Sequence, residues 1–187
     1  MRVVIFAPIN VHSLELAGLM DVFAEANARA AEPFYDVVLV AEENRPILCG
    51  SGLRVLPDCD FRASPNDPDT LLVAGSVGIP NAPGAKVIDW LACTARRSRR
   101  HGSVCTGAFL LGDAGLLGGR RVTTHWQFAA LLAERFPEAK VDGDRVFVRD
   151  GALVTSAGSS AAIDLGLSLV EEDLGRDVAL YVARRLV

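Results

Sequence analysis

Short runs of apolar, β-branched residues alternate along this chain with segments whose apolar residues recur at helical spacing. Such runs occur at residues 1–7, 35–41, 71–76 and 103–104, and the first is stopped by Pro8. Residues as apolar as these are typical of strands that are buried on both faces. A strand buried on both faces needs helices on both sides of its sheet. The pattern therefore predicts a three-layer α/β sandwich with a mostly parallel sheet.

The helical segments lie between or after these strands. One begins near Ser13, a plausible N-cap, and carries Leu16, Leu19, Met20 and Phe23 on one face. Further helices are predicted around residues 87–91, over 106–116, from 124, and from 159 to a break at Gly175. The stretch 124–127 (Thr-His-Trp-Gln) has the form of a capping box.

Two segments read as antiparallel. Residues 47–56 predict a small hairpin or paired edge strands around 50–52, and residues 140–157 predict two antiparallel strands with turns at Gly143 and Gly151. The segment 62–70 (RASPNDPDT) predicts a polar loop. The basic run 96–101 is expected to be a solvated helix end, where cations suit the negative end of the helix dipole.

Length, composition and charge argue against several classes of protein. A length of 187 residues predicts one domain spanning 1–187, and a formal net charge of −4 argues against a nucleic-acid-binding surface. The four cysteines form no C-x-x-C pair, so neither a metal site nor a bound cofactor is expected. No run reaches the length of a membrane span or has the form of a signal peptide. The expected protein is therefore cytoplasmic and makes no membrane contact.

One short stretch could carry chemistry. Cys105 follows a short strand and precedes a helix with Gly107 near its start. Such a strand-to-helix turn, termed here the elbow, places a thiol beside free backbone amides, which lower its pKa and stabilise an anion. The backbone of Gly75 and Ser76, at the end of a neighbouring strand, could add donors. A buried cysteine that acts only as a small hydrophobe is the alternative.

Two other residues could complete a site. Glu15 begins a helix after the first strand, on the same sheet edge as Cys105, although the helix dipole alone also favours an acid there. His125 could be a base for the Cys105 thiol, or a capping or packing residue. An acid, a thiol and a histidine that meet at one edge would be a workable catalytic group.

The chain resembles the ThiJ/PfpI superfamily, whose fold is flavodoxin-like and similar to class I glutamine amidotransferases. Within it, the chain resembles the N-terminal domain of AraC/XylS-type transcriptional regulators. The stretches that carry the resemblance are LELAGLMDVF, GSGLRVLPD, DTLLVAGS, SVCTGAFLLGDAGLLGGRRVTTHW and VFVRDGALVTSAGSSAAIDLGLSLVEEDLGRDVALYVARRLV.

The resemblance places Cys105 at the family's elbow and Glu15 where relatives usually carry aspartate. The protease branch has a histidine directly after the elbow cysteine, and Thr106 stands there in this chain. The isonitrile hydratase branch shares SVCTG and TTHW. Its "PGG" oxyanion loop, however, reads Ala74-Gly75-Ser76 here.

The function that the resemblance implies is an effector-sensing, homodimerising domain of a regulator. A small metabolite would bind at Gly75, Ser76, Cys105, Thr106 and Gly107. DNA would be contacted only through a helix-turn-helix domain that is absent from this chain. Two alternatives remain open: an isonitrile hydratase-type lyase that uses Cys105 with Glu15 and His125, and a redox sensor in which Cys105 is oxidised.

Overall fold

The structure is a computed structural model that describes residues 1–186. Within these residues, seven strands form one sheet in the order β10-β11-β7-β6-β1-β2-β5. Its members are β1 (Arg2–Phe6), β2 (Asp36–Ala41), β5 (Cys59–Asp60), β6 (Thr70–Val73), β7 (Arg100–Val104), β10 (Phe147–Asp150) and β11 (Leu153–Ser156). Neighbouring strands are parallel except β10, which pairs antiparallel with β11 at the edge.

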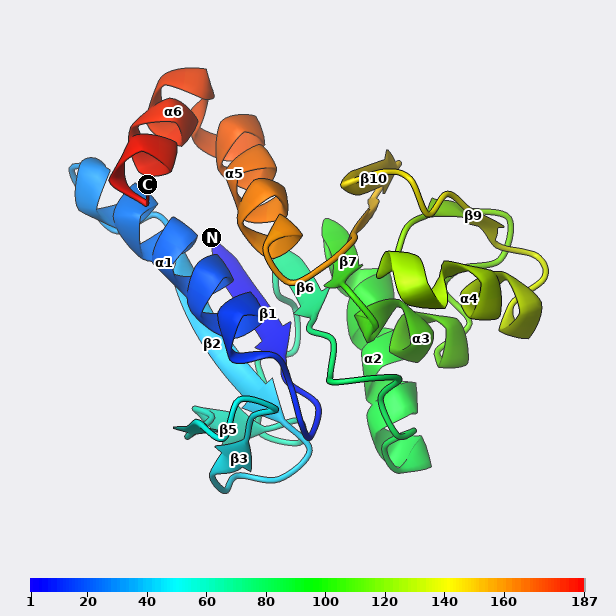
Figure 1. The fold of residues 1–187 in the computed structure, drawn as a ribbon. Helices are drawn as coiled ribbons and strands as arrows, with labels where there is room; N and C mark the ends of the chain where they lie inside the picture. Colours follow the sequence, from blue (N-terminus) through cyan, green and yellow to red (C-terminus); the bar gives the residue numbers. More distant parts are fainter. Residues whose placement is uncertain (187) are drawn as a thin grey trace.

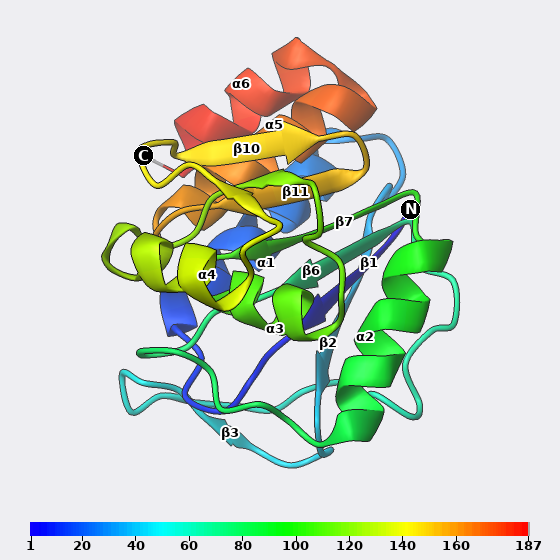
Figure 2. The ribbon, with the colours of Figure 1, turned by 90° about the vertical axis from the view of Figure 1, so that its right-hand side faces the viewer.

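Helices cover both faces of this sheet (Figures 1 and 2). The first helical layer consists of α1 (Ser13–Arg29), α5 (Ala161–Leu174) and α6 (Arg176–Arg185), and the second of α2 (Ala85–Arg97), α3 (Gly107–Asp113) and α4 (Ala129–Arg135). Alternate residues of β1 point to opposite faces. Val3 and Ile5 therefore join the core under α1 and α5, while Val4 and Phe6 join the core under α2 and α3. The predicted three-layer α/β fold is confirmed.

Two small sheets lie outside the main one. The predicted hairpin at residues 47–56 is present as β3 (Ile47–Leu48) paired with β4 (Arg54–Val55). Residues 140–157 differ in part from the prediction. The turn at Gly151 joins β10 and β11, but β9 (Lys140–Val141) pairs in parallel with β8 (Arg121–Val122) and not with its neighbour in sequence.

The helix boundaries correct three details. The N-cap of α1 is His12 instead of Ser13, which is the first helical residue. The 3₁₀ turn η1 (Trp126–Phe128) is capped by His125, whose Nδ1 accepts from the amide of Gln127 at 3.3 Å. The Thr124 hydroxyl does not cap this turn, because it donates to the carbonyl oxygen of Cys105 at 2.7 Å. The break at Gly175 is confirmed, with φ of +86° between α5 and α6.

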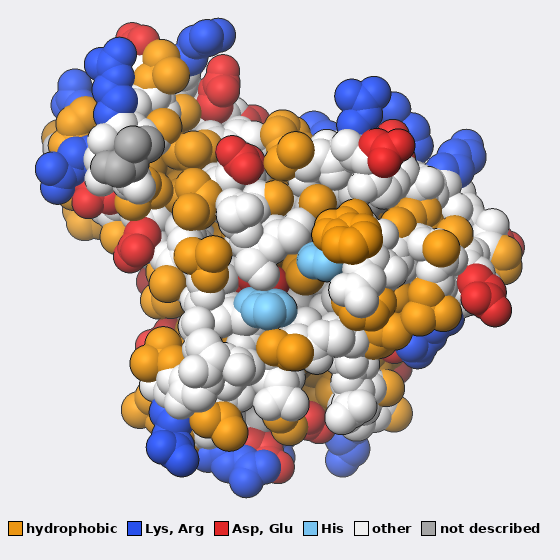
Figure 3. All heavy atoms as spheres, in the orientation of Figure 1, with side chains coloured by type: hydrophobic (Ala, Val, Ile, Leu, Met, Phe, Trp, Pro, Cys, Tyr) orange, Lys and Arg blue, Asp and Glu red, His pale blue; other side chains and the backbone are white. Residues whose placement is uncertain are grey.

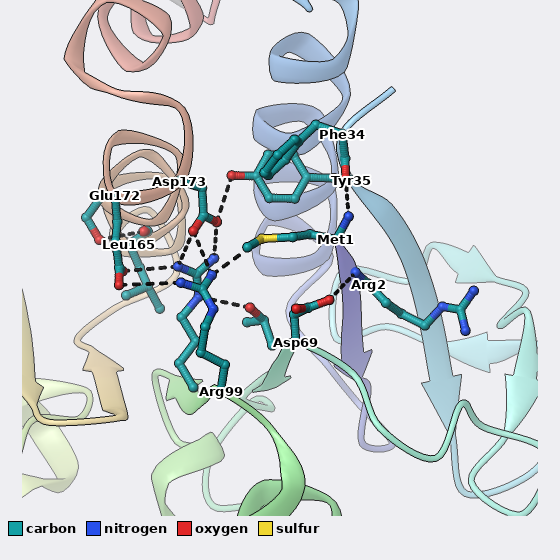
Figure 4. Close-up of polar contacts among 12 residues, drawn as sticks. Met1, Arg2, Phe34, Tyr35, Asp69, Arg99, Leu165, Glu172 and Asp173 are labelled. Atoms are coloured by element: carbon teal, nitrogen blue, oxygen red, sulfur yellow. Dashed lines mark hydrogen bonds and ion pairs between the residues drawn. The ribbon is translucent and has the colours of Figure 1, made fainter. Parts of the chain in front are cut away.

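The basic run 96–101 is not a solvated helix end throughout. Helix α2 ends at Arg97, and Arg100 begins β7 with its side chain only 2% exposed. Its guanidinium donates to Glu172 and Asp173 at the end of α5 and, at 2.9 Å, to the hydroxyl of Thr70. The network in Figure 4 joins the amino ends of the central strands to α5. Only the pairing of distant segments could reveal that this cation is buried.

None of the helices within residues 1–186 is both long and apolar enough to cross a bilayer.

Candidate functional site

The elbow is present at Cys105, between β7 and α3. Cys105 has φ of +53°, a left-handed conformation that a residue with a side chain rarely adopts. Its amide donates to the carbonyl of Ser156 at 3.0 Å, and its own carbonyl accepts from the Thr124 hydroxyl. These two hydrogen bonds hold the peptide groups on either side of Cys105. The strained left-handed backbone conformation therefore persists because the surrounding structure fixes it.

Glu15 meets the elbow from the first turn of α1 and is fully buried. One carboxylate oxygen accepts from the amide of Gly75 at 2.6 Å, and the other accepts from the hydroxyl of Ser159 at 3.0 Å. Burial raises the pKa of Glu15 to about 7, although the hydrogen bonds from Gly75, Ser159 and Cys105 oppose this rise. Near neutral pH the carboxyl can therefore either accept or donate a proton.

The Cys105 thiol differs from the expectation of a lowered pKa. Burial, followed by the negative charge of Glu15, raises the pKa of Cys105 to about 12, and hydrogen bonds from Thr106 only partly oppose the rise. The residue is 1% exposed. The favourable effect of the elbow amides is therefore smaller than the cost of desolvating a thiolate beside a carboxylate.

The backbone around the elbow is tightly packed. A Cβ on Gly75 would lie 2.8 Å from the amide nitrogen of Thr106, and one on Gly107 would lie 2.3 Å from the carbonyl oxygen of Val73. The Thr106 hydroxyl accepts a hydrogen bond from the Ser76 amide at 3.0 Å and donates one to the Ser76 carbonyl oxygen at 3.1 Å. The amides of Gly75 and Ser76 thus already have partners within the protein.

His125 lies close to this site but does not pair with Cys105 in any hydrogen bond among residues 1–186. Its Cδ2 is 3.8 Å from the position that a Cβ on Gly158 would occupy, and Gly158 is next to Ser159. Its ring stacks with that of Trp126, with the centroids 5.7 Å apart. Its Nδ1 caps η1, so the capping role is observed. A role as a base stays a prediction.

Sequence reasoning missed three contributors: His12, Thr124 and Ser159. Burial, and then the nearby charge of His125, lowers the pKa of His12, which places the two histidines close to each other. Figure 3 shows two histidine side chains near the centre of one face, with exposed hydrophobic side chains beside them. Ser159 stood at a predicted helix start, and nothing local indicated that its hydroxyl reaches back to α1.

A cavity of about 460 Å³ lies beside the elbow at the carboxyl ends of β1, β2 and β6. It is lined by Ser76 but not by Glu15, Cys105 or His125. Ser76 is bonded to Thr106, so the cavity and the elbow share one wall. Within residues 1–186, no cluster of three or more histidine, cysteine, aspartate or glutamate side chains could hold a metal ion.

Comparisons with known proteins identify the family of this chain. The sequence pattern of the DJ-1/PfpI family matches residues 1–172. Isonitrile hydratase from Pseudomonas putida is 37% identical over 178 residues, which cover 95% of this chain and 74% of the hydratase. The HTH-type transcriptional regulator GbdR from Pseudomonas aeruginosa is 29% identical over 95% of this chain, which spans only 48% of the regulator.

Among solved structures, an AraC family transcriptional regulator from Pseudomonas putida superposes with a TM-score of 0.88 and 24% identity, covering 100% of this chain and 99% of that one. At this identity the superposition supports the fold alone. The family match begins before β1, ends within α5 at residue 172, and includes the positions of Cys105 and Glu15. This chain therefore belongs to the DJ-1/PfpI family.

Proposed function

We propose that this chain is the effector-sensing and dimerising domain of an AraC-type transcriptional regulator, with a small metabolite bound at the elbow site. The elbow site is defined here as Glu15, Gly75, Ser76, Cys105, Thr106 and Gly107. The proposal depends chiefly on the buried pair of Glu15 and Cys105, each of which shifts the pKa of the other. The relationship to helix-turn-helix regulators, of which the chain spans about half, supports it. DNA contact would then come from a domain outside residues 1–187.

The electrostatics favour recognition over nucleophilic attack. A thiol with a pKa near 12 stays protonated at neutral pH, so it offers a donor instead of a thiolate. Glu15, with a pKa of about 7, can accept a hydrogen bond from an N–H group or donate one to a carbonyl. Small nitrogen-containing molecules such as amides and amines present these groups.

Burial makes such a site responsive. Because Cys105 is 1% exposed, a ligand that reaches the thiol must displace neighbouring side chains and exchange their hydrogen bonds for its own. A ligand that binds the displaced arrangement better shifts the protein toward it, and this shift is the event that a sensor transmits to its dimer contacts.

Thermal unfolding tests this proposal with a panel of small amides, amines and amino acids. We expect at least one compound to raise Tm by about 3 °C or more in the wild type and to lose that effect in Glu15→Gln, because a ligand present well above its Kd stabilises the folded state by about 3 kcal/mol. Cys93→Ser, at an exposed cysteine on α2, is the matched control and keeps the response. Equal shifts in wild type and Glu15→Gln would place the ligand elsewhere.

A second candidate is an isonitrile hydratase. It is favoured by the 37% identity to that enzyme and by a carboxyl of pKa about 7 beside the thiol. Sγ of Cys105 would bond to the isonitrile carbon while the S–H proton passes to Glu15 and Glu15 gives a proton to the same carbon, which yields a thioimidate. Water would then add across the C=N bond, with its oxygen on this carbon and one proton on nitrogen. The C–S bond would break as the remaining hydroxyl proton returns to sulfur, which releases the N-substituted formamide and the thiol.

Chromatographic detection of the formamide from a simple alkyl isonitrile separates the two candidates. Turnover by the wild type that disappears in Cys105→Ala and persists in Cys93→Ser would establish the enzyme and exclude a purely sensing domain. No formamide from any of the three proteins is the result expected from the sensor.

A further inference from the structure

The cavity beside the elbow has the size and composition of a separate binding site. Its volume of about 460 Å³ falls within the range of roughly 300–1,000 Å³ that small-molecule sites occupy. Its walls come from the loops that follow β1, β2 and β6. The open edge of a parallel sheet at the carboxyl ends of its strands is the usual place for a ligand.

The apolar part of the wall is formed where the two cores reach the sheet edge. Ile47 belongs to the core under α1, whereas Phe6 and Ile79 belong to the core under α2. Leu48 and Val77 line the same cavity and are 48% and 55% exposed. A ligand with a compact apolar body would cover surface that water now contacts, and this burial favours binding.

The wall is preformed. The amide of Val77 donates to the carbonyl of Asn10 at 3.0 Å, and the amide of Gly50 donates to the carbonyl of Val11 at 3.0 Å. Gly50 allows this approach, because a Cβ there would lie 2.1 Å from Val77 Cγ2. Asn10 itself holds a left-handed φ of +59°. Hydrogen bonds and packing thus hold together three loops that are far apart in sequence. A ligand that binds there loses little free energy to the ordering of these loops.

The charged groups in the wall leave one carboxylate without a cation. Glu43 and Arg45 pair with each other at 2.6 Å and largely cancel. Glu42 accepts from the amide of Gly84 at 3.1 Å through Oε1, which orients the carboxylate. None of the ion pairs formed by residues 1–186 includes Glu42. A partly buried carboxylate with a free oxygen attracts a cationic donor.

From this geometry we propose that the cavity binds a small organic ammonium ion. Its positive nitrogen would contact Glu42, and its compact apolar body would lie against Leu48, Val77 and Ile79. The side-chain amides of Asn10 and Asn81, which also line the cavity, offer oxygen acceptors for the remaining N–H groups. Of the elbow-site residues only Ser76 lines this cavity, and the proposal holds whether the elbow senses a metabolite or catalyses a reaction.

Titration calorimetry with three probes of matched shape tests the charge requirement: cyclohexylammonium, cyclohexanol and cyclohexanecarboxylate. We expect one cyclohexylammonium ion to bind per chain, about tenfold more tightly than cyclohexanol, because a hydrogen bond to a charged group contributes more than a neutral one. The carboxylate probe is expected to bind most weakly. Equal affinities for the three probes, or no measurable binding of cyclohexylammonium, would overturn the proposal.

Variants locate the site. Glu42→Gln keeps an acceptor for Gly84 but removes the charge, so cyclohexylammonium should weaken to the level of cyclohexanol while the cyclohexanol affinity stays constant. The control Glu32→Gln removes an equal charge at an exposed position outside the cavity and should leave both affinities unchanged. If Glu32→Gln weakens cyclohexylammonium as much as Glu42→Gln does, the attraction is long-range and no ammonium site exists.

A third variant protects the test against misfolding of Glu42→Gln. Ala82 is exposed and lines the cavity, so Ala82→Trp fills the space without disturbing the core. It should abolish binding of both cyclohexylammonium and cyclohexanol. Cys105→Ser should bind cyclohexylammonium as the wild type does. Unchanged binding in Ala82→Trp, or lost binding in Cys105→Ser, would show that the probe does not occupy this cavity.

Discussion

Glu15 and Cys105 influence each other's protonation. Burial raises the pKa of both side chains, the negative charge of Glu15 raises that of Cys105 further, and the neighbouring thiol lowers that of Glu15 against the larger effect of burial. The two side chains come from α1 and from the turn before α3, so their chemistry exists only in the folded chain. The pKa of the thiol therefore depends on burial and on the charge of a residue that lies far from it in sequence.

Replacing Glu15 by Gln should make Cys105 more reactive toward iodoacetamide. Burial still raises the thiol pKa in this variant, but the negative neighbour is gone, so the thiolate fraction should rise by about tenfold for each pKa unit recovered. Peptide mass spectrometry at several pH values measures the alkylation rate of each cysteine. Cys93, which is exposed, serves as the internal control and should react equally in both proteins. Identical Cys105 rates would show that the charge of Glu15 does not raise the pKa of the thiol.

The start of β7 and the end of α5 are joined by a buried ion pair between Arg100 and Asp173. Burial alone would raise the pKa of Asp173, but hydrogen bonds from Arg100 and Arg99 outweigh it and hold the pKa below its usual value. The hydroxyl of Tyr35, at the start of β2, also donates to this carboxylate at 3.0 Å. The pair thus connects a helix to strands in the middle of the sheet (Figure 4).

Arg100→Met should destabilise the protein by about 3 kcal/mol, because the buried Asp173 carboxylate loses the buried guanidinium and keeps only the partly exposed Arg99, at 2.6 Å, as a cation. The matched control is Arg97→Met, which removes an exposed arginine paired with Asp67 and should change the free energy of unfolding by about 0.5 kcal/mol or less. Urea unfolding followed by circular dichroism gives both values. Similar losses in the two variants would show that burial adds nothing to the Arg100 pair.

Stability of the entire chain should depend on pH partly through Glu15. Its folded pKa of about 7 lies above its unfolded value of 4.5, so protonation favours the folded state. This contribution is fully present below the unfolded pKa and is lost as the pH rises through the folded pKa. Above pH 7 the ionised carboxylate should cost on the order of 3 kcal/mol relative to low pH.

Comparing Glu15→Gln with the wild type isolates this effect from the buried histidines. The variant lacks the ionisable group, so its free energy of unfolding minus that of the wild type should increase from acidic pH to above neutral pH, mostly between pH 4.5 and about 7. Urea titrations across that interval measure the difference. A difference that stays constant with pH would mean that Glu15 is not raised in pKa.

Much of the fold could be predicted because buried strands and helices have recognisable patterns of apolar residues in the sequence. A strand covered on both faces is apolar throughout, as Val3–Phe6 and Leu71–Val73 are, and a helix over a sheet shows a stripe of apolar residues. Errors arose where the local pattern had two explanations. Arg100 follows a helix and looks solvated, and Lys140–Val141 looks like one strand of a hairpin, yet both are placed by distant segments.

The elbow site was also predicted only in part. Its residues could be named from the sequence, since a cysteine between a strand and a helix and an acid at the start of a helix are local features. The pKa values of these residues could not be predicted, because the pKa of a thiol depends on burial and on charges from segments that are distant in sequence. The cavity with Glu42 was not foreseen either, as three loops must meet before any of its residues face a common space.

The three layers, the mostly parallel main sheet and the place of Cys105 between a strand and a helix thus follow from patterns along the chain, because apolar periodicity and turn residues act over only a few positions. Packing alone decided that the thiol is protonated and covered, that Arg100 is buried, and that one carboxylate remains without a cation beside a cavity. Burial and electrostatic interaction depend on distance through space, and only the folded chain brings those groups together.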